Sequence, residues 1–168
     1  LPGARTLVVP VGGGGLAGAL AALLRAVAPR ARIVGVQSEL TNAMALSLAA
    51  GRRIDVAVPP TLADGLAGQI DDTGYAIGRF ALDLMITVSE REIAEAIAWL
   101  AREHGARVEG SGAVTVAALL HGHLPLLEGP VAAVISGGNI DAARWSAIVE
   151  RGGPAGASTA WHLAVRGW

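Results

Sequence analysis

The apolar residues of this chain fall in short runs whose lengths alternate between those of strands and those of helices. Uninterrupted apolar runs of about five residues are typical of buried strands, and longer runs with a polar side are typical of helices. We therefore expect strands at 6–11, 32–37, 85–88 and 131–135, and helices at 16–27, 42–50, 89–104, 111–121 and 141–150. This alternation predicts an α/β fold with a mostly parallel sheet flanked by helices.

Several of these predicted helices carry clear signals at their ends. Gly51 follows the second helix, where a glycine commonly stops a helix. Ser89 and Glu92 have the spacing of a capping box at the start of the third helix, and Gly105 follows its last turn. Between 51 and 84 the sequence contains Pro59 and Pro60, and we predict a loop there.

Composition narrows the class of protein. The 168 residues are enough for one domain with a substantial core, and 52% of them are hydrophobic while only 16% are charged. The thirteen basic residues are all arginine and the formal net charge is −1, so electrostatics gives no reason to expect nucleic acid or a membrane surface as partner. The chain has no cysteine, which excludes disulfides and thiolate metal sites. We expect a cytoplasmic protein.

The stretch 7–28 is nearly uncharged and has to be weighed as a membrane span. A spanning helix needs about 20 continuous apolar residues. Here Pro10 and the glycines 12–15 divide the stretch into a strand-sized piece and a helix-sized piece. We therefore expect no transmembrane helix.

Four consecutive glycines, Gly12 to Gly15, lie between the first predicted strand and the first predicted helix. Glycines let a backbone approach an anion closely, and the first amides of a helix point toward it without partners. This arrangement predicts a phosphate site. An alternative is a dinucleotide fingerprint, because Gly13, Gly15 and Gly18 have the G-x-G-x-x-G spacing and Glu39 follows the second strand.

Five segments carry a more specific pattern because they occur together in a fixed order. They are Val9–Leu16 (VPVGGGGL), Thr61–Ala67 (TLADGLA), Val88–Glu90 (VSE), Val108–Ala113 (VEGSGA) and Ile135–Asp141 (ISGGNID). In this order they closely resemble the second half of the threonine/serine dehydratase family, fold type II enzymes that depend on pyridoxal 5'-phosphate and are related to serine racemase. The resemblance covers residues 1 to about 150 and implies an incomplete large domain. We interpret 151–168 as a linker and tail of unknown role.

The resemblance implies roles for particular residues. The backbone of Gly12, Gly13, Gly14, Gly15 and Leu16 would hold the cofactor phosphate. Ser136, beside Gly137, would meet the pyridine nitrogen with a neutral hydroxyl that does not force this nitrogen to stay protonated. A turn serine at a strand end is the alternative for Ser136. The walls of the site beside the pyridine ring of the cofactor would be formed by Asp64, Gly65 and Glu109. For the two acids, a purely structural role in helix capping or in pairing with an arginine is an equal alternative.

Some features depart from the family pattern. Certain relatives bind a divalent cation through two acids after the second strand, and Gln37 and Ala43 occupy those positions here. With Glu39 as the one nearby carboxylate, we expect no metal site. We interpret His104, His121 and His123 as solvated helix ends rather than metal ligands.

The family's Schiff-base lysine belongs to the first half of those enzymes, and this chain contains no lysine. Arginine stays protonated and cannot replace it, so we assign no catalytic residue. We expect a chain that is inactive alone and needs a lysine-bearing N-terminal half. The expected substrate of the complete, homo-oligomeric enzyme is L-threonine or L-serine, with serine racemisation or 3-hydroxyaspartate deamination as alternatives. A non-catalytic phosphate-binding module is the competing hypothesis from another class.

Overall fold

Four parallel strands form one sheet at the centre of the molecule. The computed structural model describes residues 3–124 and 129–151. The strands are β1 (Thr6–Pro10), β2 (Arg32–Ser38), β3 (Leu84–Val88) and β4 (Val131–Ala133), in the spatial order β3-β2-β1-β4. Every neighbouring pair is parallel, which confirms the predicted mostly parallel sheet.

The register aligns the carboxyl ends of the strands at one edge of the sheet. Pro10 at the end of β1 pairs with Val36 of β2, and Val8 pairs with Ala133 of β4. β4 is shorter than the predicted 131–135, although the Val134 amide still donates to the Val8 carbonyl at 2.9 Å. Because β1 and β4 are neighbours, the segments that follow them leave the sheet side by side.

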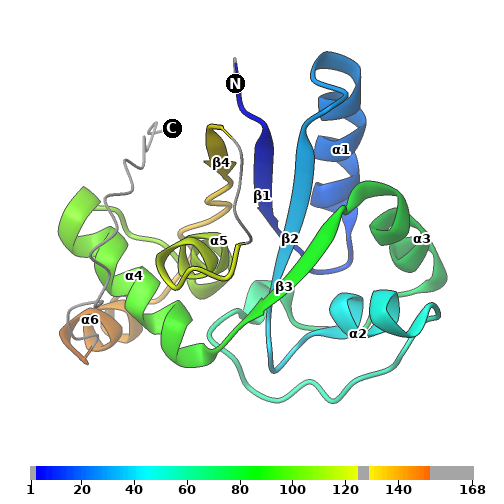
Figure 1. The fold of residues 1–168 in the computed structure, drawn as a ribbon. Coiled ribbons are helices and arrows are strands. Elements are labelled where there is room, and N and C mark those ends of the chain that lie inside the picture. The colour runs from blue at the N-terminus through cyan, green and yellow to red at the C-terminus, as the bar shows by residue number, and fades with distance from the viewer. Residues whose placement is uncertain (1–2, 125–128, 152–168) are drawn as a thin grey trace.

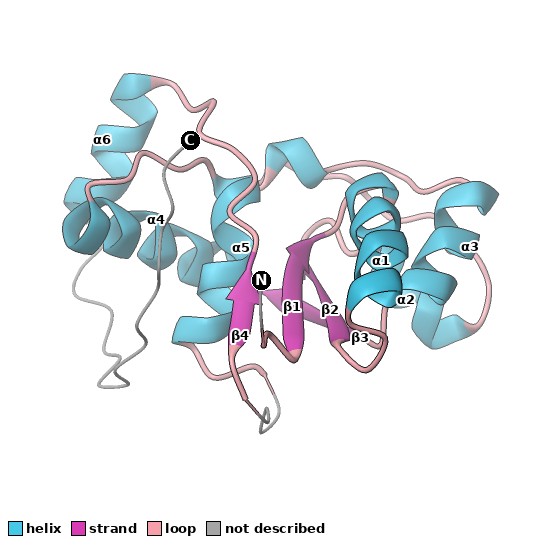
Figure 2. Ribbon diagram, turned by 90° about the horizontal axis from the view of Figure 1, so that it is seen from above, coloured by secondary structure: helices cyan, strands magenta, loops and turns pink. Residues whose placement is uncertain are grey.

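Helices cover both faces of the sheet in two layers (Figures 1 and 2). One layer holds α4 (Glu90–His104), α5 (Gly110–Leu120) and α6 (Ala142–Arg151), with α5 against the strands. The other layer holds α1 (Gly15–Val27), α2 (Ala43–Ala50) and α3 (Asp72–Ala81). The predicted helices agree with five of these to within one residue at each end, counting Ser89 as the cap of α4.

Alternation along the strands divides the core between the two faces. In β1, Val8 packs with the α4 and α5 residues, whereas Leu7 and Val9 pack on the other side with α1. All eleven residues of α5 are buried, so this helix is enclosed between the sheet and the outer helices. This explains why its sequence shows an apolar run rather than an amphipathic pattern.

The helix α3 was not predicted from the sequence, which led us to expect a loop throughout 51–84. Asp71 caps this helix by accepting a hydrogen bond from the Gly74 amide at 2.6 Å. Gly74 and Gly78 lower its intrinsic helix propensity. Both are needed for packing, because a Cβ on Gly78 would collide with the side chain of Met44. Tertiary contacts therefore decide the conformation of this segment.

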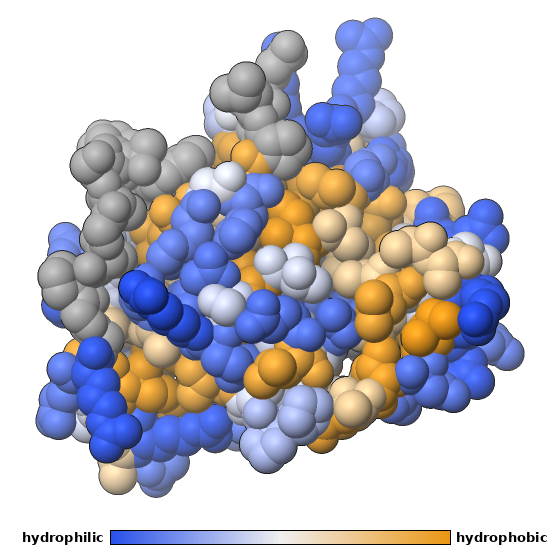
Figure 3. Space-filling view, turned by 60° about the horizontal axis from the view of Figure 1, so that its bottom comes forward, coloured by the Kyte–Doolittle hydropathy of each residue, from blue (hydrophilic) through white to orange (hydrophobic). Residues whose placement is uncertain are grey.

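The face of the molecule in Figure 3 shows hydrophilic residues mixed with groups of apolar residues. The most exposed large apolar side chains are Val27, Phe80 and Leu23, at 71%, 65% and 62%. Among the described helices, none is long and apolar enough to cross a membrane. Of the predicted linker and tail at 151–168, Arg151 is the last residue of α6, and 152–168 lie outside the described residues.

Candidate functional site

The four-glycine segment lies at the carboxyl end of β1 and leads directly into α1. The Val11 amide continues the sheet by donating to the Val36 carbonyl at 2.9 Å, and pairing with β2 stops there. Gly14 is the N-cap of α1, has φ of 94°, and offers no side chain to cap the helix. Within the described ranges, no protein oxygen accepts a hydrogen bond from the amides of Gly13, Gly14 or Gly15. Such donors at a helix start favour an anion.

The space beside these glycines is open. A Cβ built on Gly13 or on Gly15 would meet no heavy atom within 4 Å. Gly14, in contrast, faces protein, since its Cβ would lie 3.3 Å from the Gly74 carbonyl oxygen. One side of the glycine segment thus packs against α3, and the other side is open. The open side has room for the phosphate group of a ligand.

A short 3-10 turn at Asp64–Leu66 lies against this segment. A Cβ on Gly12 would be 3.4 Å from the Cα of Leu66. A Cβ on Gly65 would be 2.8 Å from the Oγ of Ser111 and 4.0 Å from the Oε1 of Glu109. The turn therefore joins the glycine segment to the start of α5.

Glu109 in turn contacts the segment that follows β4. Its amide donates to the Gly137 carbonyl at 3.2 Å, and a Cβ on Gly137 would collide with its carboxylate. Ser136 precedes Gly137 and has an exposed side chain. A continuous series of contacts thus brings together the glycine segment, Gly65, Glu109 and Gly137.

The side chain of Asp64 has protein partners. Its Oδ1 accepts a hydrogen bond from the Gly65 amide at 2.9 Å, and its Oδ2 lies 3.1 Å from Nη1 of Arg144 on α6. This pairing with an arginine is one of the structural alternatives for Asp64. The Asp64 side chain is 62% exposed, so the ion pair is a weak constraint on its own.

Gln37, near the end of β2, makes a packed polar contact with the start of α2. Gln37 is 1% exposed, and its Oε1 accepts a hydrogen bond from the Ala45 amide at 3.0 Å. It therefore anchors the start of α2. In the part of the chain that the structure describes, no group of three histidine, cysteine or acidic residues is arranged to hold a metal ion.

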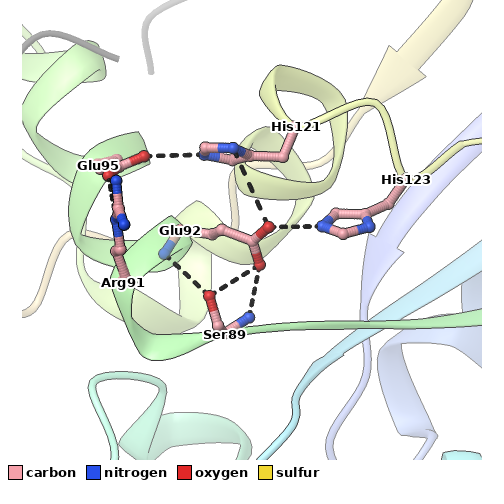
Figure 4. Close-up of polar contacts among 6 residues, drawn as sticks. All are labelled: Ser89, Arg91, Glu92, Glu95, His121 and His123. Atoms are coloured by element: carbon pink, nitrogen blue, oxygen red, sulfur yellow. Dashed lines mark hydrogen bonds and ion pairs between the residues drawn. The ribbon is translucent and has the colours of Figure 1, made fainter. Parts of the chain in front are cut away.

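His121 and His123 lie at the end of α5, as predicted, and His123 is exposed, but both also pair with acidic residues of α4, which the sequence did not indicate (Figure 4). Nε2 of His123 lies 2.7 Å from Oε1 of Glu92, and Nε2 of His121 lies 3.2 Å from Oε2 of Glu95. The second contact has the distance of an ion pair without hydrogen-bond geometry. These partners are about thirty positions away in sequence and meet because α4 and α5 pack together.

Glu92 also closes the predicted capping box of α4, which confirms that motif. Its Oε2 accepts from the Ser89 amide at 2.7 Å, and the Ser89 hydroxyl accepts from the Glu92 amide. Burial of the carboxyl opposes its ionisation, but the hydrogen bonds from Ser89 and His123 outweigh this. The pKa of Glu92 consequently lies below its ordinary value.

Two contributors to the site were missed in the sequence. Gly74 supports the glycine segment, since its own Cβ would lie 2.6 Å from the Gly13 carbonyl oxygen. Ser111 is 3% exposed and its hydroxyl has no hydrogen-bond partner among the described residues. Asp71 at the N-cap, Asp72 in the first turn and Arg79 in the last turn are local signals that could have pointed to α3 and hence to Gly74.

Gly18, which completes the alternative dinucleotide fingerprint, has a packing role. Its Cβ would lie 2.6 Å from Cγ2 of Ile77, so it permits the close contact between α1 and α3. The spacing of Gly13, Gly15 and Gly18 is thus explained without a dinucleotide.

Comparison with known proteins identifies one family. Residues 2–137 match the profile described as "Pyridoxal-phosphate dependent enzyme". The L-threonine ammonia-lyases of Geobacter sulfurreducens and Thermotoga maritima are each 40% identical over 153 residues, which is 90% of this chain and 38% of each relative. The chain therefore spans less than half the length of these curated relatives.

Solved structures give the same result for the fold. The processed form of threonine deaminase isoform 2 from Solanum lycopersicum matches with a TM-score of 0.80 and 29% identity, over 89% of this chain and 45% of that one. Maize serine racemase matches with a TM-score of 0.77 and 29% identity, over 89% of this chain and 48% of that one.

Proposed function

This chain belongs to the pyridoxal-phosphate dependent enzyme family, and from that membership we propose that it is the phosphate-binding half of a threonine/serine dehydratase. The complete enzyme would deaminate L-threonine or L-serine to a 2-oxo acid. The 40% identity to two L-threonine ammonia-lyases supports this choice of reaction.

The observation that carries the proposal is the glycine segment at the start of α1. The amides of Gly12–Gly15 and Leu16 would donate hydrogen bonds to the phosphate oxygens of the cofactor. The open space beside Gly13 and Gly15 gives those oxygens room, and the positive end of α1 favours their charge. An arginine or lysine is not needed for this kind of contact.

The neighbouring residues suit the ring side of the same cofactor. We assign the Ser136 hydroxyl to the pyridine nitrogen, with Gly137, Glu109 and Gly65 as the adjoining wall. Bound pyridoxal phosphate supplies an electron-withdrawing ring that weakens bonds at the α-carbon of an amino acid. A neutral hydroxyl from Ser136 does not force the ring nitrogen to stay protonated, and this favours elimination over transamination.

The chain supplies no lysine, so the amine that carries the cofactor must come from elsewhere. We propose that the N-terminal half of the enzyme provides it, in a cytoplasmic protein that is homo-oligomeric when complete. The likeness to maize serine racemase makes serine racemisation the second candidate for the same site.

A comparison of the isolated chain with the completed enzyme tests this function. We expect the isolated chain to bind pyridoxal phosphate, in competition with inorganic phosphate, in a calorimetric titration. With L-threonine or L-serine it should form 2-oxo acid no faster than free cofactor does. Activity should appear once a lysine-bearing segment is added. Rapid 2-oxo acid formation by the pure chain would contradict the proposal.

A further inference from the structure

Glu90, the first residue of α4, gathers three hydrogen bonds on its carboxylate. Its Oε1 accepts from the hydroxyls of Ser38 and Thr61, each at 2.6 Å. Its Oε2 accepts from the Leu62 amide at 2.5 Å. Ser38 ends β2 and is fully buried, and Thr61 is 8% exposed. Hydrogen bonds of this kind to an ionised group are stronger than neutral ones, and burial raises the cost of breaking them.

These bonds fix the end of a long irregular segment. Residues 53–63 contain no helix or strand before the turn at Asp64–Leu66 begins; the segment runs along the surface as far as Pro60 and is then buried at Thr61 and Ala63 (Figure 1). Thr61 also restrains the residue before the turn, because its hydroxyl accepts a hydrogen bond from the Ala63 amide at 3.0 Å. A second anchor comes from Arg144, which donates to the Thr61 carbonyl at 3.3 Å and pairs with Asp64 from the solvent side. Since that pair is exposed, Glu90 is the stronger anchor.

The segment held by Glu90 carries the residues that touch the candidate site from both sides. Leu66 lies against Gly12 of the glycine segment, and Gly65 lies against Ser111 and Glu109. A displacement of Thr61 and Leu62 would therefore move both contacts together. The glycine segment would lose the wall that limits its movement.

We propose that Glu90 is a positioning residue for the cofactor site, acting through Thr61 and the Asp64–Leu66 turn on the glycine segment. The proposal rests on the proposed function for the ligand, but the geometric part concerns this chain alone. Glu90 touches no reacting group and its effect is indirect.

The test is the substitution Glu90→Gln, with Glu103→Gln as its matched control on the exposed side of the same helix. The NH2 group of a glutamine side chain cannot accept a hydrogen bond, so at least one of the three contacts is lost. We expect the affinity for pyridoxal phosphate to fall about tenfold in calorimetric titration, with Glu103→Gln unchanged. Hydrogen exchange followed by mass spectrometry should rise at 61–66 and at 12–16, while the sheet strands keep their protection.

Two further variants keep the test decisive if Glu90→Gln is unstable. Thr61→Val removes the hydroxyl but keeps the size of the side chain, and it should raise hydrogen exchange at 12–16. Thr61→Ser keeps the hydroxyl and should leave the exchange at 12–16 as slow as in the unmodified chain. A general loss of stability would raise exchange in all elements alike and would overturn the proposal. So would faster exchange at 61–66 with no change at 12–16. If the unmodified chain fails to bind pyridoxal phosphate, the proposed function fails, and the exchange at 12–16 still decides the role of Glu90.

Discussion

Gly13 and Gly14, adjacent residues of the glycine segment, should respond to substitution in opposite ways. Gly13 has an ordinary negative φ and open space beside it, whereas Gly14 has φ of 94° and packed neighbours. We therefore expect Gly13→Val to fold and lose ligand, and Gly14→Ala to lose stability first. The pair separates the contribution of the glycines to binding from their contribution to the fold.

The magnitudes follow from these local surroundings. An L side chain at φ of 94° costs roughly 1–2 kcal/mol, and contacts of 3.3 Å to the Gly74 carbonyl and to Met44 add to this for Gly14→Ala. A side chain at Gly13 meets no heavy atom, and replacing a glycine at such a position restricts the unfolded chain, which stabilises by about 0.4–1 kcal/mol. The valine would occupy the space of the phosphate. Loss of two charge-assisted hydrogen bonds at about 1.5 kcal/mol each lowers affinity roughly 100-fold.

Two measurements on each variant are sufficient. Thermal unfolding followed by circular dichroism gives the stability, and calorimetric titration with pyridoxal phosphate and with inorganic phosphate gives the affinity. Ala57→Val serves as control, because Ala57 is exposed in the irregular segment before the Asp64–Leu66 turn and lies outside the site. If folded Gly13→Val binds pyridoxal phosphate as tightly as the unmodified chain, the assignment of the glycine segment is refuted.

Three other changes test separate parts of the structure. In the complete enzyme, Ser136→Ala should keep the cofactor bound and lower kcat roughly tenfold through the lost hydrogen bond, and an unchanged rate in steady-state kinetics would make Ser136 a turn residue. Glu92→Gln should cost about 1 kcal/mol in urea unfolding at neutral pH. Because the pKa of Glu92 is lowered by folding, its stabilisation is present above the ordinary pKa and is lost as the pH falls through the lowered one, so variant and unmodified chain should converge only below that lowered pKa. Gly74→Ala should destabilise by about 1–3 kcal/mol and weaken phosphate binding, since its Cβ would press on the Gly13 carbonyl oxygen; unchanged affinity by calorimetry would contradict this.

Local chemistry was sufficient to predict most elements of this chain. The glycine segment, the capping box of Ser89 and Glu92, and the glycine stops at Gly51 and Gly105 act through neighbours in the sequence, and each is observed. The order of strands and helices also follows from apolar run lengths, because parallel strands need a crossover between them. The predicted helix ends agree with the structure where the cap is made by residues close in sequence, as at Gly51 and Ser89.

Other features depend on contacts between distant residues. Helix α3 contains two glycines that disfavour helix, and its packing against α1 and Met44 compensates. The pairing of His121 and His123 with Glu92 arises because α5 packs along α4. Nothing in the spacing of these residues signals that they meet.

The candidate site divides in the same way. The sequence determined which residues have the chemistry for a phosphate, because backbone amides at a glycine-rich helix start need no distant partner. The tertiary structure decided how Gly65, Glu109 and Gly137 reach that segment, and that the Glu90 carboxylate accepts hydrogen bonds from Thr61 and Leu62 just before the Asp64–Leu66 turn. The physical reason is the distance in sequence between interacting residues. Caps and turns are formed by hydrogen bonds over three or four residues, whereas the residues around the site come from distant segments that only folding brings into contact.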